Sequence, residues 1–142
     1  VGFSLGVVEF LASTSSAKYT DAFGKEKSVA IGSLLMVPAS LLIALASQNI
    51  VSGLIGLLVV LMGFEFAVVS LLPLGAQLVP GKRGRGMGLL IGAGTLGRAA
   101  VSIAATRLYD QHGIPPAAIG SGLLALGTVL LISMHAKVAE KI

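Results

Sequence analysis

Two long stretches of this chain contain no charged residue, and they constrain the fold more than any other feature. No Asp, Glu, Lys or Arg occurs between Lys27 and Glu65, or between Asp110 and Lys137. The chain is 55% hydrophobic and only 11% charged, whereas a soluble domain carries roughly 25% charged residues. Because a small soluble domain exposes much of its surface, it has nowhere to hide such stretches. The composition therefore indicates an integral membrane protein.

A membrane-spanning helix needs about 20 apolar residues to cross a hydrocarbon core of about 30 Å. The uncharged stretch over residues 28–64 is too long for one crossing, and its polar cluster at Ser47, Gln48 and Asn49 predicts a turn. Irregular backbone cannot face lipid, and the apolar runs lack the alternation of a β-barrel. We therefore expect an all-α, polytopic membrane helix bundle. Its five predicted transmembrane helices are residues 1–17, 28–47, 51–73, 87–108 and 117–136.

Basic residues are divided unequally among the predicted loops. The first loop, the third loop and the C-terminal tail hold Lys18, Lys25, Lys27, Lys82, Arg83, Arg85, Lys137 and Lys141. The second loop has no basic residue, and the fourth has only Arg107 at its edge. Since basic residues mark the cytoplasmic side, we expect a multi-pass protein of the cell membrane with a cytoplasmic C-terminus.

Three ionisable residues, Glu9, Glu65 and Arg98, lie inside predicted membrane helices. Each costs about 2.5–3.5 kcal/mol or more near the bilayer centre, so such residues normally face the bundle interior and have a partner. Hydroxyl residues share the helix faces of Glu9 and Arg98. These are Ser13, Ser16 and Thr20 in the first helix, and Thr95, Ser102 and Thr106 in the fourth. We expect the first, third and fourth helices to face a polar interior and the other two to support them.

Two interpretations of these charges stay open. In one, Glu65 and Arg98 form a structural ion pair that locks two helices, Glu9 snorkels or pairs locally, and the hydroxyl groups form interhelical hydrogen bonds. In the other, the charges belong to a cavity, where Glu9 or Glu65 binds a coupling proton and Arg98 pairs with Glu65 or with an anionic substrate.

Two short motifs resemble sites of other protein classes but lack the necessary context. Residues 92–97 fit the dinucleotide pattern G-x-G-x-x-G, yet they lie in a long apolar helix rather than between a strand and a helix. Residues 2–6 place Ser4 in a serine nucleophile pattern, which also requires a strand and a partnering histidine and acid. The chain has no cysteine and no metal-ligand spacing. We expect no enzymatic activity, no cofactor and no metal.

The basic residues do not share one face and aromatic residues are few, so we also expect no nucleic-acid partner. The expected partner is the lipid bilayer.

One polar segment resembles a known family. Residues 17–27 are similar to the cytoplasmic loop motif G-x-x-x-D-R-x-G-R-R of the major facilitator superfamily. The matching residues are Asp21, Gly24 and Lys25, while Ala22 stands where the motif has Arg. A glycine at this position permits a tight turn, which can fix a short loop against a neighbouring helix.

Later segments resemble the tenth and eleventh helices of drug- or metabolite-efflux members of this superfamily. They are Glu65 with residues 72–83, residues 86–89 and residues 96–98. The resemblance implies that residues 1–142 are a partial C-terminal transmembrane domain, helices eight to twelve, whose missing partner is the N-terminal half. It also implies alternating-access efflux of a small molecule, coupled to protons, in a bacterial inner membrane. The alternative is a non-transporting membrane sensor or assembly subunit on the same fold.

Candidate residues for substrate or proton coupling are Glu9, Ser13, Glu65, Thr95, Arg98 and Ser102.

Overall fold

The computed structural model describes the backbone of residues 2–45 and 49–139, together with most of their side chains. Every regular element in this part of the chain is an α-helix. The helices are α1 (Gly2–Phe23), α2 (Lys25–Leu45), α3 (Ile50–Gln77), α4 (Arg83–His112) and α5 (Ile114–Ala139). The all-α prediction is therefore confirmed.

Most of the helices extend beyond the predicted apolar segments. Residues 18–27, expected as a loop, are helical except at Gly24, and Pro73 lies inside α3 rather than at its end. At 1.5 Å per residue, the 28 residues of α3 span about 42 Å, which exceeds a hydrocarbon core of about 30 Å. Hydropathy reports where a helix leaves hydrocarbon, whereas polar residues continue the same helix into the headgroup region.

Glycines with a left-handed backbone make the turns between helices. Gly24 alone separates α1 from α2, and Gly113 alone separates α4 from α5, with φ of 88° and 75°. The N–H of Gly24 donates to the carbonyl of Thr20 at 3.0 Å. The tight turn expected at Gly24 is therefore present, because only glycine adopts such a φ readily.

Asn49 caps the start of α3. Its side-chain oxygen accepts hydrogen bonds from the backbone N–H groups of Val51 and Ser52, at 3.0 and 3.3 Å. The turn predicted at Ser47–Asn49 falls partly on residues 46–48, which lie outside the described residues. The cap itself fixes where the returning helix begins.

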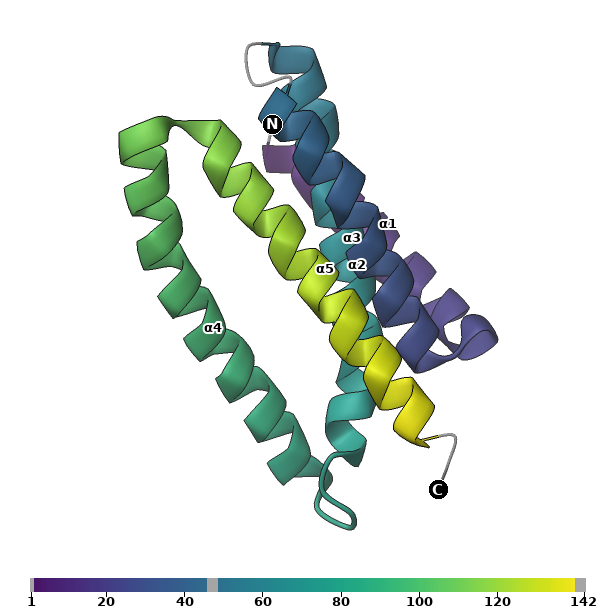
Figure 1. Cartoon of the computed structure of the whole chain (residues 1–142). Helices are drawn as coiled ribbons and strands as arrows, with labels where there is room; N and C mark the ends of the chain where they lie inside the picture. Colours follow the sequence, from purple (N-terminus) through teal and green to yellow (C-terminus); the bar gives the residue numbers. More distant parts are fainter. Residues whose placement is uncertain (1, 46–48, 140–142) are drawn as a thin grey trace.

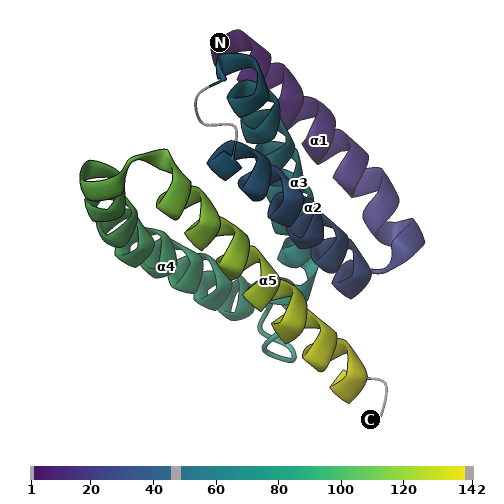
Figure 2. The same ribbon diagram turned by 45° about the horizontal axis from the view of Figure 1, so that its top comes forward.

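The helices form a packed group with one separate member (Figures 1 and 2). α2 packs extensively on both α3 and α5, and α1 packs mainly on α3. In Figure 1 α4 stands apart along most of its length, and it approaches α3 near its start and α5 near its end. The core is thus centred on α2, with α3 and α5 on its sides.

Small residues make the closest helix contacts. A Cβ built on Gly32 would lie 2.6 Å from the carbonyl oxygen of Gly63, and a Cβ on Gly63 would lie 2.6 Å from that of Gly32. The backbones of α2 and α3 therefore touch at this point. The buried side chains are also small, whereas large ones such as Leu96 and Leu131 are exposed at 73% and 70%. Small residues inside and large apolar residues outside are typical of helices that pack in lipid.

Four of the helices are long and apolar enough to cross a membrane: α2, α3, α4 and α5. The prediction of a multi-pass membrane protein is supported to that extent. α1 is not among these four, although we predicted that it crosses. Its charged residues Glu9 and Lys18 and its run of hydroxyl residues lower its mean hydropathy. A fifth crossing, by α1, stays a prediction.

Candidate functional site

Glu65 lies near the middle of α3, where a membrane helix is furthest from water. Its carboxylate is half-buried and accepts a hydrogen bond from the hydroxyl of Ser13, with 3.2 Å between the two oxygens. Ser13 belongs to α1, so this bond joins α1 to α3 through two residues that are 52 positions apart in the sequence. Both residues were candidates from the sequence, and the structure brings them together.

A second polar contact joins the same two helices. The hydroxyl oxygens of Thr20 and Ser70 are 2.7 Å apart, and both side chains are buried. Seven residues separate Ser13 from Thr20 on α1, so the two contacts lie on one face of that helix. Ser13 and Thr20 therefore form interhelical contacts with α3, as one of the open interpretations had it, while the side chain of Ser16 lies outside the described residues.

Arg98 does not form the expected ion pair with Glu65. Within the part of the chain that the structure describes, neither residue has an ion-pair partner, and Arg98 is exposed. α3 and α4 touch where Gly86 approaches the carbonyl of Gly75 and Leu90 packs against Gly75. Arg98 is eight residues beyond Leu90, about 12 Å along the helix, and the two helices have diverged there. Among the described residues no ion pair joins them, because Glu65 bonds to α1 whereas Arg98 lines a cavity between α3 and α4 that Glu65 does not line.

The hydroxyl residues near Arg98 bond within their own helix. The Thr95 hydroxyl donates to the carbonyl of Ile91 at 2.9 Å, and the Thr106 hydroxyl donates to that of Ser102 at 2.8 Å. Ser102 is exposed on the same helix. These hydrogen bonds of Thr95 and Thr106 therefore lie within α4 and do not join it to another helix.

Glu9 is exposed on α1, one turn before Ser13. Of the candidate loop motif, Gly24 makes the turn and Lys25 begins α2, half-buried. The side chain of Asp21 lies outside the described residues, as does that of Ser4. The structure thus gives the backbone of this motif but not the contacts of its acidic residue.

A groove lies between α3 and α4 beside Arg98; we call it the α3–α4 groove. Its volume is about 340 Å³. Phe64, Val68 and Leu72 line it from α3, and Ile91, Thr95 and Arg98 line it from α4. Glu65 does not line it. The sequence-predicted residues are therefore divided between two places, with Ser13 and Glu65 toward α1 and Thr95 and Arg98 toward the groove.

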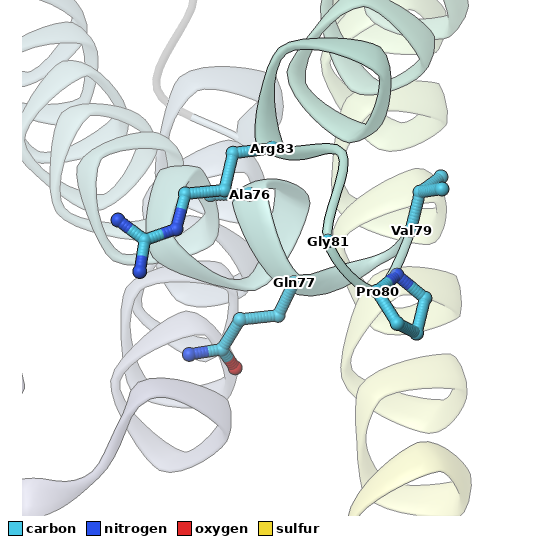
Figure 3. Close-up of a pocket in the computed structure, with 6 residues that line it drawn as sticks. All are labelled: Ala76, Gln77, Val79, Pro80, Gly81 and Arg83. Atoms are coloured by element: carbon cyan, nitrogen blue, oxygen red, sulfur yellow. The ribbon is translucent and has the colours of Figure 1, made fainter.

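Two further cavities lie near helix ends, away from the intramembrane charges. One, of about 560 Å³, surrounds the turn between α3 and α4, and Figure 3 shows the side chains of Gln77 and Arg83 extending away from Pro80. The basic residues Lys82, Arg83 and Arg85 lie at or next to this turn and are exposed. This cavity is larger than the α3–α4 groove, but it is remote from Glu65 and Arg98, so we centre the candidate site on those charges.

The other end cavity, of about 470 Å³, brings Glu26 and His135 to one space among α2, α3, α4 and α5. Glu26 lies between the first two predicted transmembrane helices, and His135 lies near the end of the fifth. Their shared position depends on how α2 and α5 pack, for which the sequence contains no signal.

Among the residues that the structure describes, no three His, Asp or Glu side chains gather as a metal site requires. No protein-family model matches this chain, and no curated protein or solved structure is significantly similar to it. The family resemblance therefore stays a prediction, and the four apolar helices identify the chain only as a multi-pass, helical protein of the membrane type.

Proposed function

We propose that this chain is the C-terminal part of a major facilitator superfamily transporter, helices eight to twelve. It exports a small molecule across the cell membrane in exchange for protons, with its C-terminus in the cytoplasm. The observation that carries this proposal is the hydrogen bond between Ser13 and Glu65, which ties a central carboxylate of α3 to α1.

A carboxylate at the middle of a membrane helix is costly when charged. The Ser13 hydroxyl offsets part of that cost, and binding of a proton removes the charge altogether. The proton also changes Glu65 from an acceptor into a group that can donate. The contact between α1 and α3 thus responds to proton binding, and a ligand can shift a conformational equilibrium only through such a difference between states.

The packing supports alternating access. α2 and α3 touch through their backbones at Gly32 and Gly63, so this pair moves as one body. α1 is joined to α3 partly through exchangeable polar contacts, and α4 packs little against the rest. A rigid pair beside two loosely held helices suits a mechanism in which helices rock around a central site.

A solute-driven proton assay tests the proposal. Inverted membrane vesicles that contain the full-length protein are acidified by respiration, and acridine orange reports the loss of the pH gradient when solutes are added. A panel of amphipathic organic anions and cations serves as the probe. We expect at least one solute to dissipate the gradient, and Glu65→Gln to abolish that response.

Glu26→Gln is the matched control, because Glu26 is a carboxylate near a helix end and not beside Ser13. It should keep the response. An equal response in Glu65→Gln and the unaltered protein rejects the coupling role. Absence of any response in the unaltered protein favours the alternative, a non-transporting sensor or assembly subunit.

A further inference from the structure

We propose that the α3–α4 groove binds an amphipathic organic anion, whose negative group pairs with Arg98 and whose apolar body lies against α3. This inference names the substrate class of the transporter and, for transport itself, rests on the proposed function. The binding can be tested without transport.

The charge of Arg98 is the first argument. Arg98 lies fifteen residues after Arg83, about 22 Å along α4, so both ends of this 30-residue helix are distant. A guanidinium keeps its proton in proteins and therefore cannot lower its cost in a membrane by becoming neutral. Within the described residues it has no ion-pair partner. The acidic residue expected to pair with it, Glu65, instead accepts a hydrogen bond from α1.

The walls of the groove are the second argument. The α3 side consists of apolar side chains, including Phe64, Val68 and Leu72, and no acidic side chain lines either side. On the α4 side Gly94 leaves room, since a Cβ built there would meet no atom within 4 Å. The Thr95 hydroxyl is engaged with the carbonyl of Ile91. One cation beside apolar walls recognises a molecule with one anionic end and an apolar body.

The size of the groove agrees with a small ligand. Its volume of about 340 Å³ is near the lower end of the range for small-molecule sites, about 300–1,000 Å³. A carboxylate or sulfonate pairs with a guanidinium through two parallel hydrogen bonds, which gives orientation as well as affinity. An inorganic anion would leave the apolar walls unused.

The chain contains no tryptophan, which permits a specific test. In Phe64→Trp the single indole lies at the groove and serves as an energy-transfer donor. The probes are 1-anilinonaphthalene-8-sulfonate, which is an anion, and N-phenyl-1-naphthylamine, which has the same rings without the sulfonate. The full chain is placed in nanodiscs of phosphatidylcholine, and saturable transfer to each probe is measured.

We expect Arg98→Gln to weaken binding of the sulfonate about tenfold, as loss of one charged pair would, and to change binding of the neutral probe less than about twofold. Arg98→Lys should retain part of the preference for the anion. Arg107→Gln is the matched control, because it removes an exposed arginine of the same helix that does not line the groove. Gly94→Leu fills the groove and should weaken binding of both probes.

Equal binding of the sulfonate before and after Arg98→Gln would overturn the proposal. So would an equal loss in Arg107→Gln, because the effect would then be general surface charge. Displacement of the sulfonate by phosphatidylglycerol in the nanodisc, but not by decanoate in solution, would assign the groove to a membrane lipid and reject a soluble anion. Retained probe binding without solute-driven proton movement would reject the proposed function alone.

Discussion

Apolar, glycine-containing sequence has two different outcomes in this molecule. In one region α2 and α3 are in close contact, and in the other α4 is isolated. Both regions are apolar and rich in glycine. In α2, 39% of the most apolar 18-residue segment is buried, whereas in α4 none of it is. The glycines of α2 and α3 bring two backbones into contact, while those at 88, 92, 94 and 97 in α4 have open space around them. Glycine content therefore does not by itself identify a packed interface.

The two regions also differ in the surroundings of their charged residues. Glu65, on the packed side of the molecule, has a hydrogen-bond donor from a neighbouring helix, whereas Arg98, on the isolated helix, is exposed. Glu65 and Arg98, each near the middle of its helix, thus differ in what surrounds them. The packed region supplies a partner for Glu65 from within the described chain, whereas the structure shows no ion-pair partner for Arg98 among the residues that it describes.

The largest expected difference between the two regions is the effect of adding one methyl group. Gly32→Ala places a Cβ 2.6 Å from the Gly63 carbonyl and 2.7 Å from the Ala67 nitrogen, both backbone atoms. We expect it to destabilise the bundle by roughly 1–3 kcal/mol, as overpacking does. Gly92→Ala meets no atom within 4 Å and should instead stabilise α4 by about 0.5–1 kcal/mol through helix propensity.

Thermal unfolding in detergent micelles, followed by circular dichroism, measures both variants. Equal effects of the two substitutions would show that α4 is as tightly packed as α2, and the contrast between the regions would be lost.

The water exposure of α4 can be measured by thiol labelling, because the chain has no native cysteine. Alkylation requires the thiolate, which forms in water and not in hydrocarbon. If α4 lines a solute pathway, Ser102→Cys should react with N-ethylmaleimide on the order of tenfold faster than Leu123→Cys on the exposed face of α5. Ser70→Cys, in the buried contact with Thr20, is the unreactive control. Equal slow labelling of all three positions would place Ser102 in lipid.

The Ser13–Glu65 hydrogen bond should contribute a small but specific amount to the free energy that holds α1 against α3. In a double-mutant cycle of Ser13→Ala and Glu65→Ala, we expect a coupling energy of about 0.6 kcal/mol and no more than about 1.7 kcal/mol, the mean and the maximum for interhelical hydrogen bonds in membranes. Thr14→Ala is the control, because the Thr14 hydroxyl bonds to the carbonyl of Phe10 in its own helix. A coupling energy as large for Thr14 as for Ser13 would contradict a direct contact.

The smallest expected effect concerns a buried hydroxyl in the packed region. Ser40 is 1% exposed, and among the described residues its hydroxyl has no hydrogen-bond partner. Removing an unpaired buried hydroxyl is neutral or stabilising, so Ser40→Ala should raise the free energy of unfolding by up to about 1 kcal/mol. Ser70→Ala, which removes a bonded hydroxyl, should lower it. A loss in both variants would indicate that the Ser40 hydroxyl is bonded after all.

The sequence was sufficient to predict the helices but not how they pack. Over the residues that the structure describes, each predicted apolar segment coincides with one of the helices α1 to α5, because a backbone in lipid must satisfy its own hydrogen bonds. The ends were wrong at residues 18–27, because helix formation does not stop where hydropathy falls. Ser13 and Glu65 were identified singly from their faces and their burial cost, yet their contact was not predicted. Of the two interpretations left open for Glu65 and Arg98, the structure does not show the ion pair among its described residues, because charge complementarity says nothing about where two helices cross, and here α3 and α4 cross near Gly75 and Gly86.

The single-residue turns have a consequence for how the chain enters a membrane during synthesis. Insertion of a helix depends on its apolarity, and a central charge opposes it. α1, which carries Glu9, is followed after Gly24 alone by the apolar α2, and α4, which carries Arg98, is followed after Gly113 alone by the apolar α5. If α1 crosses the bilayer as proposed, each of the two helices with a central charge, α1 and α4, leaves the ribosome directly attached to an apolar helix without one. The insertion machinery would then receive two hairpins, in each of which the second helix secures the first.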